Sequence, residues 1–479
     1  MREIRLKKLE KIRRLGIDPY PARCQRKQTI AQALKMMGKK VAVAGRIMAI
    51  RGHGGIQFFD LRDESGKIQL VFKKDQLPAT SHKLRALLDI GDFVDAQGKV
   101  FKTQAGEISV LVDNFQLLTK SLRPLPSKWY GLKDIEERYR QRCVDLIMNP
   151  KVREIFRIRT KVLTELRNYF DSHGFMEVET PILQPIYGGA LARPFITHHH
   201  ALDIDLYLRI SDELYLKRLI VGGFEKVYEV CKDFRNEGID RQHNPEFTQI
   251  EFYWAYTTYE DLMKFTEQML SCVIKKVLGK LKVKHEDDVL DFTPPFRRVT
   301  FREAMLKETG IDINQVNTER KLLAEIKKRK IKFELEGVVG YGALLDEFYK
   351  KTLRPKLIQP TFLLDYPVEK ISLAKRKEGE KSKIASFQLL IKGFEVITAY
   401  NELNDPVDQA ERWRESERLA KKGLEEYEAF DADYVRALEY GMPPTAGWGM
   451  GIDRFISFLT DSHTIKDVIL FPTLRPGKR

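Results

Sequence analysis

Short runs of alternating hydrophobic and polar residues fill the chain between residues 41 and 118. Five runs rich in β-branched and aromatic residues follow one another there: VAVAGRIMAI, IQFFDLRD, GKIQLVF, DFVDAQGKVF and EISVLVDNFQLL. Turn-forming residues separate them at DESG (63–66) and TQAG (103–106). Period-two alternation bounded by turn residues predicts β-strands. Five strands in so short a segment predict a small closed barrel.

The OB-fold is the five-stranded barrel that fits this pattern, and it commonly binds single-stranded nucleic acid on one face. A basic stretch at residues 2–15 precedes the barrel, with Ile4, Leu6, Leu9 and Ile12 at roughly helical spacing. Two interpretations of this stretch stay open. It is either a solvated helix packed on its own domain or an arm that contacts RNA phosphates.

The pattern changes at residues 122–132, where LRPLPSKWYGL contains two prolines and a glycine and predicts a linker. Helical patterns, roughly 137–172 and 257–279, then mix with strand-like runs such as LYLRIS, EKVYEV and FTQIEFYWAY. These elements do not alternate in a regular βα order, and no GxGxxG or GxxxxGK[ST] loop is present, so a Rossmann or P-loop nucleotide site is not expected. An α+β domain, an antiparallel sheet flanked by helices, fits better.

These patterns divide the chain into four parts. We expect a basic helical segment at 1–38, the barrel at 39–121, a linker at 122–136 and the α+β domain at 137–479. The lysine-rich segment around 280–355 is expected to be a helical insertion in that last domain.

Composition is that of an ordinary globular protein: 479 residues, 43% hydrophobic and 32% charged. No apolar run is long enough to span a bilayer, and MREIRLKKLEKIRR lacks the apolar segment of a signal peptide, so a cytoplasmic protein is expected. Cys24, Cys143, Cys231 and Cys272 are far apart, which argues against a disulfide framework or a zinc knuckle. The net charge of +15 would suit a polyanionic partner such as nucleic acid.

Candidate chemistry concentrates in residues 225–256, EKVYEVCKDFRNEGIDRQHNPEFTQIEFYWAY, which predict a strand ending near Arg235, a polar loop and a second strand. Alternation puts Ile250, Phe252 and Trp254 on the core face of the second strand. The opposite face carries Phe247, Gln249, Glu251 and Tyr253. An arginine suited to phosphate, a ring suited to stack on a purine and a glutamate would then face one cavity. The alternative interpretation is a surface hairpin with scattered charges.

Several blocks of the sequence resemble the class II aminoacyl-tRNA synthetases, in the form found in lysyl-tRNA synthetases. FRNEG and HNPEFT resemble motif 2, FMEVETPIL with Pro181 resembles motif 1, and GWGMGIDRFISFL with Arg454 resembles motif 3. Further blocks similar to the lysine enzymes are GGALARPFITHHHALDIDLYLRISDELYLKRL, AYNELNDPVDQ, AGRIM, GKIQL and FKTQAGEIS. The match covers nearly the whole chain and is weakest at about 280–355. It implies a lysine–tRNA ligase that forms lysyl-adenylate from lysine and ATP and transfers lysine to the 3′ end of its tRNA.

The resemblance also implies an ATP site. Arg235 of motif 2 would bind the α-phosphate and the substrate carboxylate, and Arg454 of motif 3 would hold the γ-phosphate near a helix N-terminus. These two arginines are the expected catalytic residues, because the reaction needs alignment and charge neutralisation and no acid–base group. Phe247 would stack on the adenine. The implied ATP site comprises Arg235, Glu237, His243, Asn244, Phe247, Glu395 and Arg454.

The implied lysine pocket is acidic and aromatic. Glu213 and Glu251 would bind the α-amino group, and Tyr253 and Glu402 would bind the ε-ammonium group. Such a pocket suits lysine and argues against the aspartyl and asparaginyl relatives, whose substrates need a donor. Tyr400 would lie along the lysine stem, and Gly189 would let the backbone approach the substrate. The implied set is Gly189, Glu213, Arg235, Glu251, Tyr253, Thr398, Tyr400 and Glu402.

Three positions depart from the family pattern. Thr398 stands near the substrate carboxylate where asparagine is usual, and Trp448 stands where leucine is usual. Gln388 replaces a glutamate that, with the residue matching Glu395, holds magnesium on the ATP phosphates. Glutamine offers a carbonyl oxygen but no negative charge, which weakens the magnesium site.

The three histidines at 198–200 are adjacent on a strand and cannot all converge on one metal ion.

In the barrel, Phe58, Gln69 and Glu107 match positions that read the anticodon in lysine enzymes. Phe58 and Phe59 are neighbours on a strand, so one of them is expected to be buried. Motif 1 lies at a dimer interface in this class, and a homodimer is expected. Two alternative functions stay open: a lysine-activating paralogue that modifies a protein, which would lack the barrel, and a non-catalytic RNA-binding relative.

Overall fold

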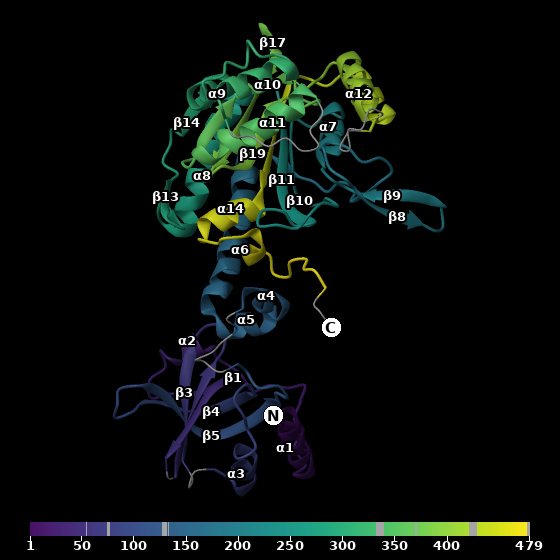
Figure 1. The fold of residues 1–479 in the computed structure, drawn as a ribbon. Coiled ribbons are helices and arrows are strands. Elements are labelled where there is room, and N and C mark those ends of the chain that lie inside the picture. Colours follow the sequence, from purple (N-terminus) through teal and green to yellow (C-terminus); the bar gives the residue numbers. More distant parts are fainter. Residues whose placement is uncertain are drawn as a thin grey trace. The chain divides into compact units, whose positions relative to one another are not determined.

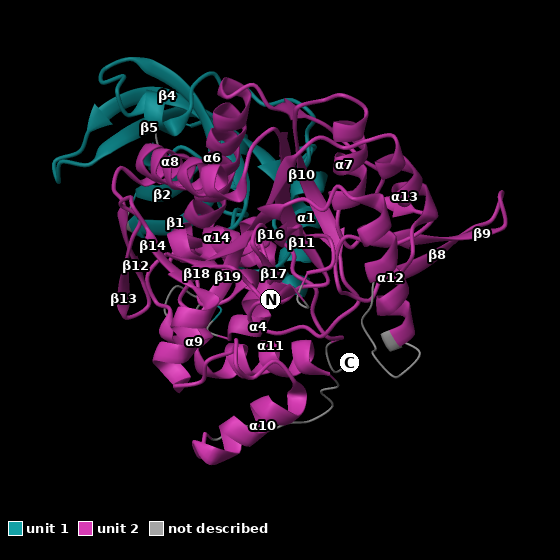
Figure 2. Cartoon of the chain, turned by 90° about the horizontal axis from the view of Figure 1, so that it is seen from above, with its two compact units in different colours: residues 1–133 teal, residues 134–479 magenta. Residues whose placement is uncertain are grey.

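The protein is described by a computed structural model covering residues 1–53, 55–73, 77–126, 132, 134–331, 340–368, 371–420 and 429–476. The chain forms two compact units, residues 1–133 and 134–479 (Figure 2). Part of the predicted linker, residues 127–131 and 133, lies outside the described residues. No helix in the described ranges has both the length and the apolar character needed to cross a membrane.

A closed five-stranded barrel forms the first unit, as the alternating pattern predicts. The strands run in the order β1-β2-β3-β5-β4, with β3 and β5 parallel and the other neighbours antiparallel. Phe59 is buried in the barrel core, whereas Phe58 is only half-buried. The strand bounds are β1 (Lys40–His53), β2 (Ile56–Arg62), β3 (Lys67–Lys73), β4 (Phe93–Lys102) and β5 (Ile108–Thr119).

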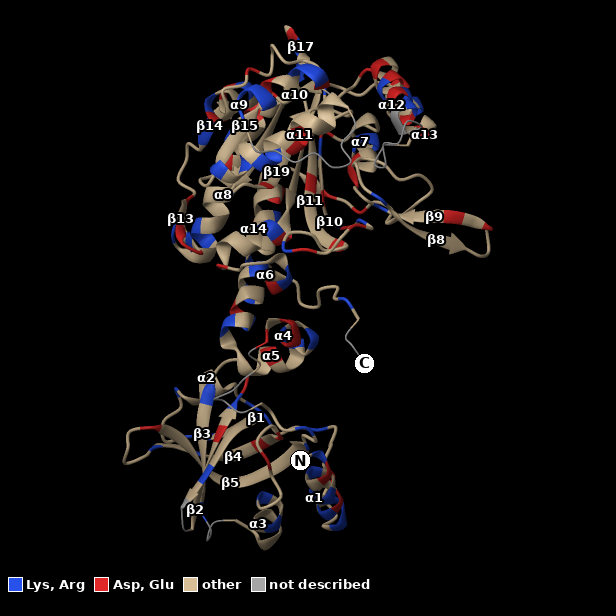
Figure 3. Ribbon diagram, in the orientation of Figure 1, with Lys and Arg blue, Asp and Glu red and all other residues tan. Residues whose placement is uncertain are grey.

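Helix α1 (Arg2–Arg14) packs on the barrel of its own unit. Ile12 belongs to the barrel core, and the Arg5 guanidinium donates to the carbonyls of Ile90 and Ser121 at 2.9 and 3.0 Å. Much of the rest of the helix is exposed and rich in Lys and Arg (Figure 3). The packing supports the first interpretation of the basic stretch, a solvated helix on its own domain. The short helices of this unit are α2 (Ile30–Ala33) and α3 (Ala79–Arg85).

An eight-stranded sheet is the centre of the second unit (Figure 1). Its order is β14-β15-β18-β19-β20-β11-β10-β6; the pairs at its two ends are parallel and the pairs between them antiparallel. The predicted α+β class is confirmed, with parallel pairs added at the edges. The strand bounds are β6 (Met176–Glu177), β10 (Lys226–Phe234), β11 (Glu246–Ala255), β14 (Arg297–Thr300), β15 (Thr361–Leu364), β18 (Ser386–Ile391), β19 (Phe394–Asn401) and β20 (Thr445–Gly451).

One face of this sheet is sealed by helices α6 (Pro150–Ser172), α8 (Tyr259–Leu278) and α14 (Ile452–Leu459). Aromatic rings fill that interface, with Phe252 stacked on Trp448 at 5.0 Å between ring centroids. The Trp448 indole also donates to Thr266 at 2.9 Å. The departure at Trp448 is therefore a packing feature of the core.

The segment 280–355 contains strands as well as the expected helices. A two-stranded hairpin comes first, and β14 joins the edge of the central sheet. The elements here are β12 (Lys282–His285), β13 (Asp288–Asp291), α9 (Phe301–Thr309), α10 (Glu319–Lys328) and α11 (Tyr341–Thr352). The remaining elements of the unit are α4 (Ile135–Arg140), α5 (Arg142–Met148), β7 (Leu183–Gln184), β8 (Phe195–His199), β9 (Ile204–Leu208), α7 (Glu213–Val221), η2 (Arg354–Lys356), β16 (Arg376–Lys377), β17 (Glu380–Ile384), α12 (Pro406–Ala420), α13 (Ala432–Glu439) and α15 (Ile465–Val468).

Candidate active site

A cavity of about 1490 Å³ opens on the sheet face opposite α6 and α8. Strand β20 forms part of its floor: Gly447, Gly449 and Gly451 line the cavity, while the side chains of Trp448 and Met450 pack in the core. Alternation along a strand makes this division possible. The lining includes Gly189, Glu213, Arg235, Glu237, His243, Asn244, Phe247, Glu251, Tyr253, Gln388, Glu395, Thr398, Tyr400 and Arg454.

The β10–β11 hairpin supplies one wall of the cavity. Phe247 pairs with Asp233 and Glu251 with Glu229 in the strand register. Phe247, Gln249, Glu251 and Tyr253 line the cavity, whereas Ile250 and Phe252 are fully buried in the core. The alternation predicted from the sequence is therefore observed. The alternative of a surface hairpin with scattered charges is wrong.

Two arginines give one end of the cavity its positive charge. Arg454 is the third residue of α14; it donates to the Glu395 carbonyl at 2.9 Å and lies 3.3 Å from His243 Nε2. Arg235 lies over the Phe247 ring at 5.0 Å from its centroid. Burial lowers the pKa of Arg454, and the Glu395 carboxylate opposes this effect. This end is suited to bind a polyphosphate with an aromatic base stacked beside it.

Carboxylates and phenols crowd the opposite end. Tyr400 donates to Glu213 at 2.7 Å, and the Tyr253 hydroxyl donates to Glu251 at 3.3 Å. Burial, reinforced by nearby carboxylates, raises the pKa of Glu251 well above its usual range. Removing charged groups from water without a counter-charge is costly, so this end is built to receive a cation.

Lys217 is a member of this acidic end that the sequence reasoning missed. Its fully buried ammonium is ion-paired with Glu213 at 2.5 Å and with Glu402. Burial alone would lower the pKa of Lys217, but Glu213 and Glu402 raise it well above its usual value. The signal available in the sequence was the i, i+4 spacing of Glu213 and Lys217 on one helix.

Glu402 is the predicted pocket residue that lies behind the cavity wall. It is buried and is absent from the cavity lining. It packs against the Gly447 backbone beside Tyr253: a methyl group added at Gly447 would overlap the Glu402 carboxylate and the Tyr253 ring. Gly189 has a left-handed φ of +84°, and a Cβ there would lie 2.9 Å from Ser211 Oγ. Both glycines are required by close approach, and Gly447 was not predicted.

The proposed magnesium ligands form a hydrogen-bonded group. Gln388 donates from its amide nitrogen to Glu395 at 2.7 Å, and its carbonyl oxygen accepts from Tyr366 at 2.5 Å. Thr398 donates to the other Glu395 oxygen at 2.8 Å. Gln388 thus directs a nitrogen toward Glu395 and its oxygen toward Tyr366. The donor set fits an oxygen-seeking cation through Glu395 but not through Gln388.

In the barrel, the predicted anticodon residues lie on β2, on β3 and just before β5. Gln69 donates to Glu107 at 2.9 Å and accepts from Ser109 at 3.1 Å. Phe58 and Val71 are register partners, as are Asp60 and Gln69, so Phe58 and Gln69 share the outer face of the barrel. The half-buried ring of Phe58 is available to stack on an unpaired base.

The sequence of the chain is similar to known families and to individual known proteins. The family profile described as tRNA synthetases class II (D, K and N) matches residues 134–475, and the OB-fold nucleic acid binding domain matches residues 41–118. A lysine–tRNA ligase of Carboxydothermus hydrogenoformans is 48% identical over 99% of this chain and 98% of its own length. A lysine–tRNA ligase of Clostridium novyi is 50% identical over 99% of this chain and 94% of its own length.

Proposed function

The chain belongs to the lysine–tRNA ligases of the class II tRNA synthetases, and from this premise we propose that it joins L-lysine to the 3′ end of its tRNA in an ATP-dependent, AMP-forming reaction. One observation carries the proposal. A single cavity has arginines at one end and buried carboxylates with tyrosines at the other. That arrangement matches a substrate pair of a polyphosphate nucleotide and an amino acid with a cationic side chain.

Adenylate formation is the first chemical step. A carboxylate oxygen of lysine attacks the α-phosphorus of ATP, and the bond from that phosphorus to pyrophosphate breaks. Arg235 binds the α-phosphate and the lysine carboxylate, and Arg454 binds the γ-phosphate. Both act by alignment and by neutralising charge that grows in the transition state. Phe247 stacks on the adenine, and Glu237, His243 and Asn244 complete the nucleotide site.

Transfer to tRNA is the second step. The terminal ribose hydroxyl of the tRNA attacks the carbonyl carbon of the adenylate and loses its proton, and AMP leaves. The barrel positions the tRNA by contacts of Phe58, Gln69 and Glu107 with anticodon bases. The net charge of +15 favours association with the tRNA phosphates.

Lysine selection rests on the acidic end of the cavity. Glu213 and Glu251 hold the α-amino group, and Tyr400 lines the stem. Tyr253 faces the ε-ammonium, and Glu402, buried beside Tyr253, supplies negative charge there. Lys217 neutralises part of the charge of Glu213 and Glu402, and the acceptors that remain would face the two cationic groups of lysine. Gly189 and Thr398 would lie at the carboxylate side of the amino acid.

Magnesium is expected to enter with ATP. Glu395 would hold it, and the ion would neutralise the phosphate oxygens when bound. Gln388 and Thr398 would act on Glu395, because both hydrogen-bond to its carboxylate. Gln388 is thus proposed as a residue that orients the metal ligand.

A homodimer is also part of the proposal. Several large apolar side chains in and just after motif 1 are exposed in the single chain, namely Met176, Ile182, Leu183 and Ile186. A cluster of this kind is typical of a protein interface. Analytical ultracentrifugation would test it, and a monomer at enzymatic concentrations would contradict it. The cytoplasm, where tRNA is charged, is the proposed compartment.

Pyrophosphate exchange with ATP, measured across the amino acids, is the experiment that tests the function. Exchange should depend on lysine, and the purified protein should then charge lysine tRNA. Exchange without tRNA charging would favour a paralogue that lysylates a protein. Absence of exchange with every amino acid would favour a non-catalytic RNA-binding relative.

A further inference from the structure

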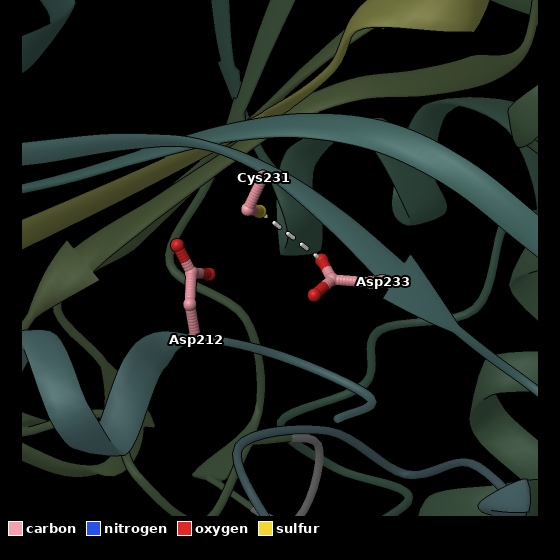
Figure 4. Close-up of side chains that lie close together, drawn as sticks. All are labelled: Asp212, Cys231 and Asp233. Carbon is pink, nitrogen blue, oxygen red and sulfur yellow. Dashed lines mark hydrogen bonds between the residues drawn. The ribbon is translucent and has the colours of Figure 1, made fainter. Parts of the chain in front are cut away.

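Three side chains that could bind a metal ion lie close together on the catalytic unit (Figure 4). Asp212 precedes α7, and Cys231 and Asp233 lie two residues apart on β10. Their ligand atoms lie within 4.8 Å of one another. The residues are 0%, 3% and 0% exposed, so water does not reach them freely.

The Asp212 carboxylate accepts from no N–H or hydroxyl group among the described residues, and its one hydrogen-bonding neighbour is the Glu251 carboxyl group. Both Asp212 oxygens are buried, and Oδ1 of Asp233 is also buried without a hydrogen-bond donor. Asp212 stands at the N-cap of α7, where aspartate ordinarily accepts from backbone N–H groups, but its side chain makes no capping bond. Instead it points toward Cys231 and Asp233 (Figure 4). Buried polar atoms are nearly always satisfied, so orphaned oxygens directed at one point indicate a missing partner.

The surrounding charges do not supply that partner. Arg235 and Arg209 are the adjacent cations, but Arg235 donates to the Ile210 carbonyl at 3.4 Å, and Arg209 donates to Glu229 at 2.7 Å and reaches Asp233 Oδ1 only at 3.5 Å. Glu251, the carboxyl group beside Asp212, has a pKa raised well above its usual range by burial and by the charge of Asp212, so it shares a proton with Asp212 and brings no positive charge. Buried carboxylates in excess of their cations are found with a bound metal ion or in a neutral form.

We propose that Asp212, Cys231 and Asp233 bind a divalent transition-metal ion of the zinc class. One thiolate with carboxylate oxygens is a borderline-soft donor set, which suits zinc or cobalt better than magnesium or calcium. Binding replaces the thiol proton of Cys231, which is released to solvent, with a metal–sulfur bond. A buried water molecule enclosed with the ion would complete the coordination. The inference does not depend on the proposed lysine–tRNA ligase activity.

The ion would fix two segments that carry proposed substrate ligands. Glu213 follows Asp212 directly, and Arg235 comes two residues after Asp233. Joining the start of α7 to the end of β10 would hold both side chains in place. The role is structural, and the bound ion takes no part in the chemical steps.

Cobalt substitution tests the site in the full chain without reference to catalysis. Protein stripped with a chelator and titrated with Co²⁺ should bind one ion per chain with a thiolate-to-cobalt charge-transfer band. Cys231→Ser should abolish the band, and Asp212→Asn should weaken Co²⁺ binding by roughly 10–100-fold or more. Cys143→Ser, which removes an exposed cysteine, is the matched control and should leave both unchanged.

Three outcomes would overturn the proposal: no stoichiometric Co²⁺ binding, a band that survives Cys231→Ser, or a band lost in Cys143→Ser. Circular dichroism checks that each variant is folded. Should Cys231→Ser not fold, the near-isosteric Asp212→Asn carries the test, and unchanged Co²⁺ affinity in that variant contradicts the site. Normal Co²⁺ binding without lysine-dependent exchange would refute the proposed function and leave the metal site standing.

Discussion

The barrel and the catalytic unit each bury a lysine among carboxylates, but they complete the group differently. In the barrel, Lys120 donates to Asp89 at 2.6 Å, to Asp92 at 2.7 Å and to the Leu87 carbonyl at 3.0 Å, and Asp92 also accepts from the Ser121 N–H. In the catalytic unit, Lys217 faces Glu213 and Glu402, with Glu251 and two tyrosines also close by. There the acids outnumber the cation.

The difference separates folding from binding. A network closed by its own chain stabilises one arrangement and has nothing left to offer a ligand. Surplus buried acceptors raise the free energy of the empty site. A bound cation relieves that penalty, so the site selects for a cation. Substitutions in the Lys120 group should therefore change stability, and substitutions in the Lys217 group should change lysine recognition.

The largest effect is expected at the arginine end. Arg235→Ala should lower the rate of lysine-dependent pyrophosphate exchange by roughly 10³-fold, because a charge aimed at the transition state is lost. Binding of tRNA, measured by filter retention, should change little. Arg436→Ala, on the exposed side of α13, is the control. Equal loss of exchange and tRNA binding would indicate misfolding.

Substitution in the closed network of Lys120, Asp89 and Asp92 should change only the stability of the protein. Lys120→Met leaves the buried Asp92 without its cation, while Asp89 keeps its ion pair with Lys8, and should lower the free energy of unfolding of the barrel unit by about 3–5 kcal/mol. Urea unfolding of the full chain, followed by a barrel probe, measures this loss. Lys40→Met removes an exposed partner of Asp113 and should cost only about 0–1 kcal/mol. A raised KM for lysine in folded Lys120→Met would contradict the proposed division of roles.

Substitution in the open network of Lys217, Glu213 and Glu402 should change the recognition of lysine. Glu402→Gln should raise the KM for lysine by roughly 10–100-fold, as loss of a charged hydrogen bond implies, and the KM for ATP much less. Steady-state exchange with each substrate varied in turn gives the two constants. Glu415→Gln, at the cavity rim, is the control. The reverse pattern, with ATP affected more than lysine, would overturn the role of Glu402.

A smaller effect is expected at Gly447, where Glu402 and Tyr253 pack closely against the backbone. Gly447→Ala places a methyl group against Glu402 and Tyr253, whereas the Cβ in Gly449→Ala would lie 3.3 Å from Glu251. We expect Gly447→Ala to raise the KM for lysine by about tenfold, a cost of about 1.4 kcal/mol within the range for overpacking. Gly449→Ala should change it less. Equal effects of the two variants would show that close approach at Gly447 is not selective.

The sequence predicted what depends on periodicity. Alternation located the five barrel strands and placed Glu251 and Tyr253 on the cavity side of β11. It could not reveal Lys217 as the partner of Glu402, since that pair joins α7 to the end of β19 across the fold. The proximity of Asp212 and Cys231 could not be predicted either. Periodicity shows which face of an element a side chain occupies, but not which other element packs against that face. The strands inside 280–355 were missed because lysine-rich composition hid their short apolar runs.

The smallest effect should come from the magnesium side, where one substitution tests whether the group around Glu395 is open or closed. Gln388→Glu replaces the amide that donates to Glu395 with a carboxylate, while Tyr366 can still donate to the new side chain. Two facing carboxylates attract a divalent cation more strongly than one. The Mg²⁺ concentration for half-maximal exchange should therefore fall by a few-fold, roughly 1 kcal/mol. Gln409→Glu, a buried position outside the cavity, is the control. An unchanged Mg²⁺ dependence in Gln388→Glu would mean that Glu395 holds its ion without help from residue 388, and that this group, like Lys120 in the barrel, is already complete.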